Sequence, residues 1–208
     1  PTADTLELRG RIANHESYDL DLLTADDQGN WKYLVSGRLF DTDGFFIVEE
    51  DLRGSVDRPA NSSFQTFFGR TYYKNFHAGV NVYHEERGNG TQLQNNSSRI
   101  ALFETGHEAP SWKGSFYTQS GVFENTFSRI LPGRSAEFIT AEQEFRSVGS
   151  GAAFSWRPRS NLLVGTDWRR VAWSDNNQNL AGLFAQQLLP LHQDVDLLAG
   201  LRFDWWRG

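Results

Sequence analysis

A chain of 208 residues with a net charge of -6 and no cysteine excludes several classes of protein. The negative charge argues against a nucleic-acid partner, which needs a basic surface, and the lack of cysteine excludes a disulfide framework or a thiolate metal site. No apolar run approaches the roughly 18 residues of a transmembrane helix. Because the chain starts at Pro1 and contains no methionine, we expect a processed product or a segment of a longer chain.

The composition combines high polarity with many aromatic residues. Aromatic residues make up 14% of the chain, Gly occurs 19 times and Pro only 6 times, and the mean hydropathy is -0.54. Disordered chains are poor in aromatic residues, so this chain is not of that class. The combination is typical of many strands that each have one apolar and one polar face.

Alternation of apolar and polar residues with a period of two runs along most of the chain. The clearest examples are "NFHAGVNVY" (75–83) and "VDLLAGLRFDWW" (195–206). In both, most apolar residues fall on one face of a strand and most polar residues on the other. We predict eleven strands of about 10 residues, the length of a tilted membrane strand: 4–13, 17–25, 31–41, 62–71, 76–86, 98–106, 112–123, 141–157, 161–173, 178–189 and 194–206.

Two of these segments are ambiguous, and the connections between the segments alternate in length. Residues 98–106 alternate weakly, and 179–191 is also compatible with a short helix. The long or very polar connections are 42–61, 87–97 and 124–140, and every second connection is short. Outer-membrane barrels show this asymmetry between tight periplasmic turns and longer outer loops.

The alternating faces are compatible with a soluble β-sandwich and with a membrane barrel, in which the apolar face meets lipid and the polar face a wet lumen. The strands are long, and aromatic residues cluster at the strand ends. The polar faces carry full charges such as Asp167, Arg202 and Asp204, which a dry core would exclude. These features favour an all-β, antiparallel, up-and-down transmembrane barrel over the sandwich.

Four phrases resemble the middle of the barrel of TonB-dependent outer-membrane receptors, in particular those with an N-terminal carboxypeptidase-regulatory-like domain. They are "GRLFDTDGFFIVEEDLRGSVDRPANS", "HEERGNGTQLQNNSSRI", "LVGTDWRRV" and "LLAGLRFDWW". The most specific residues are Phe40 to Gly44, followed by Arg53-Gly54 and Pro59-Ala60-Asn61. The similarity covers nearly all of residues 1–208.

The resemblance implies a barrel of about 22 strands in the bacterial outer membrane, filled by a plug, that takes up a scarce nutrient with energy delivered through TonB. Eleven strands are half of such a barrel, and we find no plug domain and no TonB box in the sequence. An open sheet would leave two edges that lipid does not tolerate. The expected partners are therefore outer-membrane lipid, the remainder of the barrel with its plug, and the TonB system.

The acidic stretch that begins at Asp41 resembles a calcium loop. An EF-hand needs glycine at the sixth position, but Gly44 is fourth after Asp41, so that motif does not fit. A looser calcium site formed by Asp41, Asp43 and Glu49 is a weak alternative to a solvated loop. No histidine pair has metal-binding spacing and no catalytic set occurs, so we expect neither an enzyme nor a cofactor.

The long loops hold the candidate ligand contacts, because loops carry specificity on a fixed scaffold. The candidates are aromatic and cationic residues of these loops: Phe45, Phe46, Arg53, Arg87 and Arg134. The ligand could be a small molecule such as a siderophore or cobalamin, a glycan, or a peptide. The alternative function is a non-transporting structural or ligand-binding component of a larger membrane or surface assembly.

Overall fold

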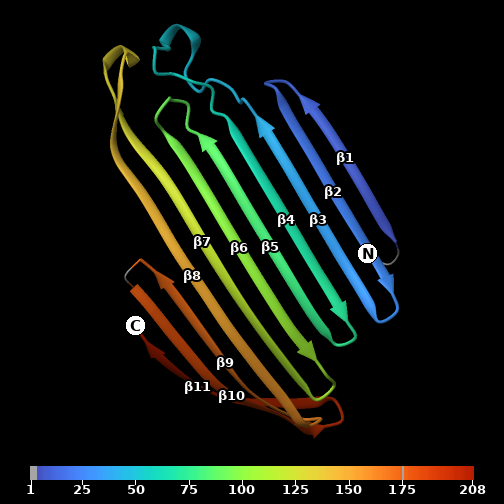
Figure 1. Ribbon diagram of the computed structural model, residues 1–208. Coiled ribbons are helices and arrows are strands. Elements are labelled where there is room, and N and C mark those ends of the chain that lie inside the picture. Colours follow the sequence, from blue (N-terminus) through green and yellow to red (C-terminus); the bar gives the residue numbers. More distant parts are fainter. Residues whose placement is uncertain (1–3, 175) are drawn as a thin grey trace.

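The computed structural model, which describes residues 4–174 and 176–208, is one curved antiparallel sheet in which every strand pairs with the next in sequence (Figure 1). The expected all-β, up-and-down fold with eleven strands is confirmed. The strands are β1 Thr5–Ala13, β2 Ser17–Gln28, β3 Trp31–Thr42, β4 Ser62–Tyr73, β5 Phe76–Gly88, β6 Asn95–Glu108, β7 Trp112–Ile130, β8 Glu137–Arg159, β9 Leu162–Trp173, β10 Asn176–His192 and β11 Val195–Arg207.

Connections alternate between a loop end and a turn end of the sheet. The loop end carries segments 43–61, 89–94 and 131–136, and the turn end carries only short connections such as that between β2 and β3, where Gly29 adopts a φ of 68°. Two single-turn 3₁₀ helices, Glu50–Leu52 and Pro132–Arg134, lie in the loops. Among residues 4–174 and 176–208, no helix is long and apolar enough to cross a membrane.

Several predicted boundaries were wrong, because strands continue into segments expected to be loops. The loop predicted at 87–97 spans only 89–94 in the structure, and the loop predicted at 124–140 spans only 131–136. Strands β5 to β8 all extend farther toward the loop end than predicted. The pairing of β7 with β8 continues out to Ile130 and Glu137, because backbone hydrogen bonds hold the two strands together even where apolar and polar side chains no longer alternate. Residues 179–191 are part of strand β10 rather than a helix, because β9 and β11 pair with them on both sides.

The two faces of the sheet differ in polarity and in crowding. On β2, Leu20 and Leu22 are 43% and 39% exposed, whereas the side chains of Asp19 and Asp21 on the other face are only 12% and 29% exposed. A curved sheet spreads side chains on its convex face and crowds them on its concave face. The apolar face is therefore convex, and the polar face is concave.

Ion pairs tie neighbouring strands together across the concave face. Arg38 of β3 donates to Asp19 of β2 at 2.9 Å, and Arg11 of β1 donates to Asp21 at 2.6 Å. Arg202 of β11 donates to Asp167 of β9 at 2.9 Å, spanning β10. Opposite charges on adjacent strands favour this register over a one-residue slip, which would bring these charges to the apolar face.

Glycines on the concave face leave room for large side chains of the neighbouring strand. The Phe184 ring lies over Gly165, and a Cβ at Gly165 would also lie 2.6 Å from the carbonyl oxygen of Phe154. The Tyr117 ring covers Gly151 in the same way. The small residues 149–151 of β8 therefore include one glycine that an aromatic ring covers.

We predict that Gly165→Ala lowers the free energy of unfolding by about 1–3 kcal/mol, because the backbone oxygen of Phe154 cannot move aside as a side chain can. Gly149→Ala is the matched control, since its Cβ would meet only the Arg170 carbonyl oxygen at 4.0 Å. Urea-induced unfolding of both variants and the parent chain measures the difference. Equal stability of the two variants would contradict the packing described for Gly165.

Candidate functional site

The loop between β3 and β4, residues 43–61, folds back over the loop end of the sheet (Figure 1). Its start is held by the Asp43 amide, which donates to the carbonyl of His15 at 3.1 Å. Farther along, the Arg58 amide donates to the Gly90 carbonyl at 3.1 Å, and the Val56 amide donates to the Arg134 carbonyl at 3.3 Å. One loop thereby connects the β1–β2 turn, the β5–β6 loop and the β7–β8 loop.

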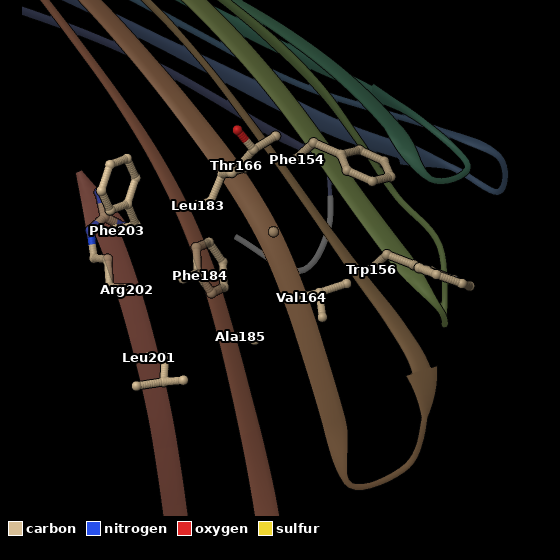
Figure 2. A pocket seen from close by; sticks show the side chains of 11 residues that line it. Phe154, Trp156, Val164, Thr166, Leu183, Phe184, Ala185, Leu201, Arg202 and Phe203 are labelled. Carbon is tan, nitrogen blue, oxygen red and sulfur yellow. The ribbon is translucent and has the colours of Figure 1, made fainter. Parts of the chain in front are cut away.

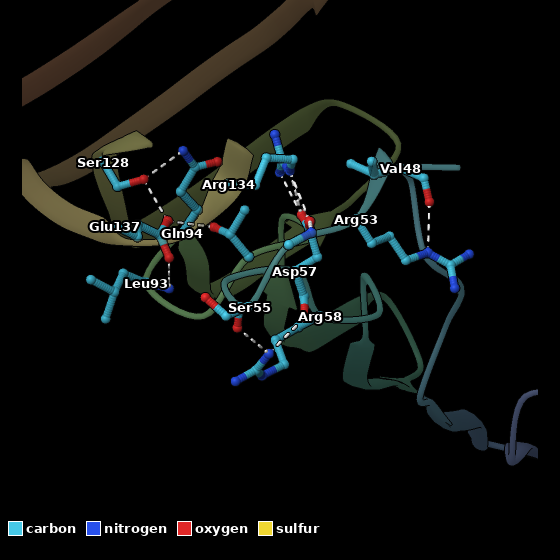
Figure 3. A network of polar contacts seen from close by, with 12 residues as sticks. Val48, Arg53, Ser55, Asp57, Arg58, Leu93, Gln94, Ser128, Arg134 and Glu137 are labelled. Carbon is cyan, nitrogen blue, oxygen red and sulfur yellow. Dashed lines mark hydrogen bonds and ion pairs between the residues drawn. The ribbon is translucent and has the colours of Figure 1, made fainter. Parts of the chain in front are cut away.

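Asp57 is the centre of this arrangement (Figure 3). It is only 4% exposed, and its carboxylate accepts from Arg134 Nε at 2.8 Å and from the Gly54 amide at 2.7 Å. Charge-assisted contacts of this kind are about twice as strong as neutral hydrogen bonds. The Arg134 guanidinium lowers the pKa of Asp57, and Asp57 in turn raises the pKa of Arg134.

Glu137 forms a second polar centre beside the first, at the tip of the β7–β8 hairpin (Figure 3). Its carboxylate accepts from Thr91 Oγ1 at 2.6 Å, from the Leu93 amide at 3.0 Å and from the Ser128 hydroxyl. Burial pushes the pKa of Glu137 upward, but the three hydrogen bonds and the nearby Arg134 outweigh it, so the net direction is downward. Glu137 thus fixes the β5–β6 loop to the β7–β8 hairpin.

The sequence-predicted ligand residues occupy three different settings. Phe45 and Phe46 lie exposed on loop 43–61, and the Arg53 guanidinium lies 4.1 Å from the centre of the Phe46 ring while its Nε donates to the Val48 carbonyl at 2.8 Å. Arg134 is paired with Asp57, which gives it a structural role that the sequence did not indicate. Arg87 lies on β5 rather than on a loop, opposite Ser62 and Asn96.

The calcium hypothesis gains no geometric support from the structure. Asp41 lies in β3 opposite Tyr18 and Ser63, and Asp43 and Glu49 are exposed on the loop that follows. Within the described parts of the chain, no three His, Asp or Glu residues gather in a group that could hold a metal ion.

Sequence reasoning missed Asp57 and Glu137, the two residues that organise the loop end. A signal for Asp57 was present, since Gly54 precedes it by three residues and Asp side chains commonly accept from nearby backbone amides in turns. Glu137 had no such local signal. Its partners Thr91 and Ser128 are 46 and 9 residues away in sequence.

The convex face contains a shallow apolar hollow of about 500 Å³ over β8 to β11 (Figure 2). It is lined mainly by aromatic and aliphatic side chains of the apolar face, among them Phe154, Trp156, Val164, Leu183 and Phe203. It contains none of the predicted ligand residues. A surface of this kind suits an alkyl chain rather than a polar ligand.

Three solved structures with a similar fold are of a siderophore receptor and of a ferric enterobactin receptor. The siderophore receptor PirA from Acinetobacter baumannii is 11% identical, with a TM-score of 0.58, and the match covers 96% of this chain and 38% of PirA. Two mutant forms of the ferric enterobactin receptor PfeA from Pseudomonas aeruginosa are 13% and 12% identical, each with a TM-score of 0.55, and the matches cover 98% and 97% of this chain and 39% of PfeA.

These likenesses show a shared fold. The chain spans about two fifths of the length of these receptors, in agreement with a sheet that makes up part of a barrel. No protein-family profile and no curated protein sequence matches the chain.

We predict that Arg134→Ala releases loop 43–61 from the β7–β8 hairpin, because it leaves the buried Asp57 carboxylate without its cation. A buried polar group without a partner costs about 1–3 kcal/mol, or more when it is charged. Hydrogen exchange of the amides of residues 54–58 measures the release. Arg53→Ala serves as the control, because Arg53 lies in loop 43–61 but forms no hydrogen bond or ion pair with Asp57 and acts on it only weakly through its charge. Similar exchange in both variants would contradict the role of Arg134.

We predict that attachment of the loop is independent of pH from about 5 to 8 and is lost only in acid. The pKa of both Asp57 and Glu137 is lowered in the folded loop, so their contribution is complete above the unfolded pKa values of about 3.9 and 4.3. It disappears as the pH falls below about 4 through the lowered folded values. Proteolysis of loop 43–61 by an acid-active protease, compared between pH 3 and pH 5, tests this. Equal cleavage at both pH values would contradict it.

Proposed function

We propose that this chain forms about half of the wall of a TonB-dependent receptor in the bacterial outer membrane, and that the complete receptor takes up a scarce nutrient. The observation that carries the proposal is a single up-and-down sheet with an apolar convex face, a charged concave face and all of its long loops at one end. The fold shared with two siderophore receptors supports it.

The convex face has the composition of a lipid-facing wall. Leu201, Phe203 and Ile12 are 84%, 69% and 82% exposed, and burying each of them would contribute about 1.5–3 kcal/mol. Soluble proteins rarely expose contiguous apolar patches larger than a few hundred Å². A bilayer removes this surface from water without a second protein layer.

Aromatic pairs at the turn end agree with a membrane–water boundary. Trp31 and Tyr73 lie with ring centres 4.7 Å apart, and Trp112 stacks on His107 at 4.4 Å. Trp and Tyr favour this depth because their rings are apolar and their N–H or O–H groups reach water. The turn end is therefore the periplasmic end in this proposal, and the loop end faces the outside.

The two edge strands of the sheet indicate that the complete receptor contains further strands. Strands β1 and β11 each pair on one side only, and an unpaired backbone edge is very costly in lipid. We infer that further strands of the same receptor close the barrel, and that a plug and a TonB-contacting segment lie outside residues 1–208. The resemblance to receptors with a carboxypeptidase-regulatory-like domain remains a prediction.

We predict that cysteines placed at opposite ends of the sheet differ in accessibility on intact cells. The two variants are Leu52→Cys at the loop end and Asn75→Cys at the turn end. This chain has no native cysteine, so the labelling has no background once any cysteines elsewhere in the receptor are replaced. A membrane-impermeant maleimide should label Leu52→Cys on intact cells, and Asn75→Cys only after the outer membrane is permeabilised. Labelling of both on intact cells would exclude a membrane-spanning sheet.

Transport and the structural alternative differ in their need for energy. In a receptor that transports, cells expressing the complete protein lose accumulation of its nutrient when a protonophore collapses the proton gradient, whereas binding at the cell surface persists. A purely structural or ligand-binding component retains binding and shows no accumulation at all. The second result, together with correct labelling of Leu52→Cys, would favour the alternative.

A further inference from the structure

An aromatic row crosses the concave face near the loop end. Register partners place Phe40, Phe64, Phe123 and Phe145 on one line across β3 to β8, interrupted at β5 and β6 by Glu85 and Ser98. The rings of Phe40 and Phe64 stack with their centres 5.0 Å apart, and those of Phe123 and Phe145 with their centres 6.4 Å apart. Phe123 and Phe145 are 38% and 53% exposed, so their faces are free to receive a ligand.

An amide row lies directly above the aromatic row, one step closer to the loops. It follows the register Ser62, Arg87, Asn96, Asn125 and Gln143 across β4 to β8. Each member is two residues along its strand from a member of the aromatic row, so the rows are separated by about 6.6–6.8 Å. Three of its five members are amides, which donate and accept hydrogen bonds at the same side-chain end.

The charges at this end of the sheet do not favour an anionic ligand. The loop segments 43–61, 89–94 and 131–136 contain five carboxylates, from Asp43, Glu49, Glu50, Asp51 and Asp57, against three arginines. The Asp57–Arg134 pair cancels, which leaves four carboxylates against two arginines. Within the two rows, Arg87 and Glu85 carry opposite charges. Arg38, whose guanidinium lies 5.0 Å from the centre of the Phe64 ring, is paired with Asp19, so neither row concentrates positive charge.

We propose that the aromatic row and the amide row together bind a neutral, hydroxyl-rich ligand, namely an oligosaccharide. Sugar rings have apolar faces of C–H groups that stack on aromatic rings, whose faces are electron-rich. Their hydroxyls both donate and accept hydrogen bonds and so match the amides. The inference rests on the proposed function, because that function makes the concave face the wall of the ligand path.

The spacing of the rows matches this ligand class. A sugar chain lying along the rows keeps its ring faces on the Phe side chains and its hydroxyls toward Asn96, Asn125 and Gln143. An anionic iron chelate, the kind of ligand that a ferric-siderophore receptor takes, would instead meet the excess carboxylates of the loops. The favoured ligand therefore differs in charge from the one named for PfeA.

The test uses the complete receptor, purified in a detergent without a sugar headgroup, and isothermal titration with maltoheptaose, cellohexaose and xylohexaose. Ferric enterobactin is titrated in parallel. Phe145→Ala removes the most exposed ring of the aromatic row and should weaken binding of the preferred oligosaccharide by up to about tenfold, because a lost aromatic stack corresponds to a factor of that size. Phe154→Ala, on the same strand but on the convex face and 44% exposed, should leave the dissociation constant unchanged.

A second test variant with its own control shows whether a loss of binding in the first variant comes from misfolding. Asn125→Ala removes an amide from the amide row, and Thr126→Ala changes the next residue of β7, which points to the other face. Weaker binding in Asn125→Ala and in Phe145→Ala, but in neither control, supports the proposal. Equal weakening in variants and controls, or no binding of any of the three sugars at millimolar concentration, overturns it.

The outcomes also separate this inference from the proposed function. If ferric enterobactin binds and the sugars do not, the ligand class is wrong, while proton-gradient-dependent accumulation of the iron chelate would leave the transport proposal standing. If the sugars bind through the two rows but cells accumulate none of them, the ligand class stands and the transport proposal fails.

Discussion

The backbone ladder between consecutive strands is the constraint on which the rest of this structure depends. Because every strand pairs with its sequence neighbour in an antiparallel register, residues opposite each other must share a face. That rule alone assembles the apolar convex face, the charged concave face and the two rows near the loop end. It also explains why Gly165 faces the Phe184 ring, since both residues lie on the crowded concave face and a residue without a Cβ leaves room for the ring.

The loops at the loop end are held in place by different contacts from those that hold the strands. Loop 43–61 has no regular ladder of its own, yet it is attached to two neighbouring hairpins through Asp57 and its backbone contacts. Burying the Asp57–Arg134 pair costs desolvation free energy, which offsets much of the attraction between the two charges. The pair therefore serves chiefly to fix one arrangement of the loops rather than to raise the free energy of unfolding. Phe45, Phe46 and Arg53 are thereby held on an anchored loop rather than a free one.

The strands and their faces were predictable from sequence because alternation with a period of two is a local signal. Val80 and Val82 show it in β5, as do Leu201 and Phe203 in β11. The ends of β7 and β8 were not predictable, since both faces are wet there and alternation disappears. The Asp57–Arg134 contact was equally hidden, because its partners are separated by 77 residues and meet only through loop geometry.

The distribution of paired and unpaired polar groups separates the scaffold from the candidate ligand surface. Lower on the concave face, charges are satisfied by partners on other strands, as in Arg70 with Glu104 and Arg202 with Asp167, so a ligand would have to break an ion pair to bind there. Near the loops, exposed side chains of β8 such as Gln143 and Phe145 offer hydrogen bonds and an apolar ring face without such a cost. The proposed oligosaccharide would therefore bind just below the loops, where exposed rings such as Phe145 are available and where binding breaks no ion pair.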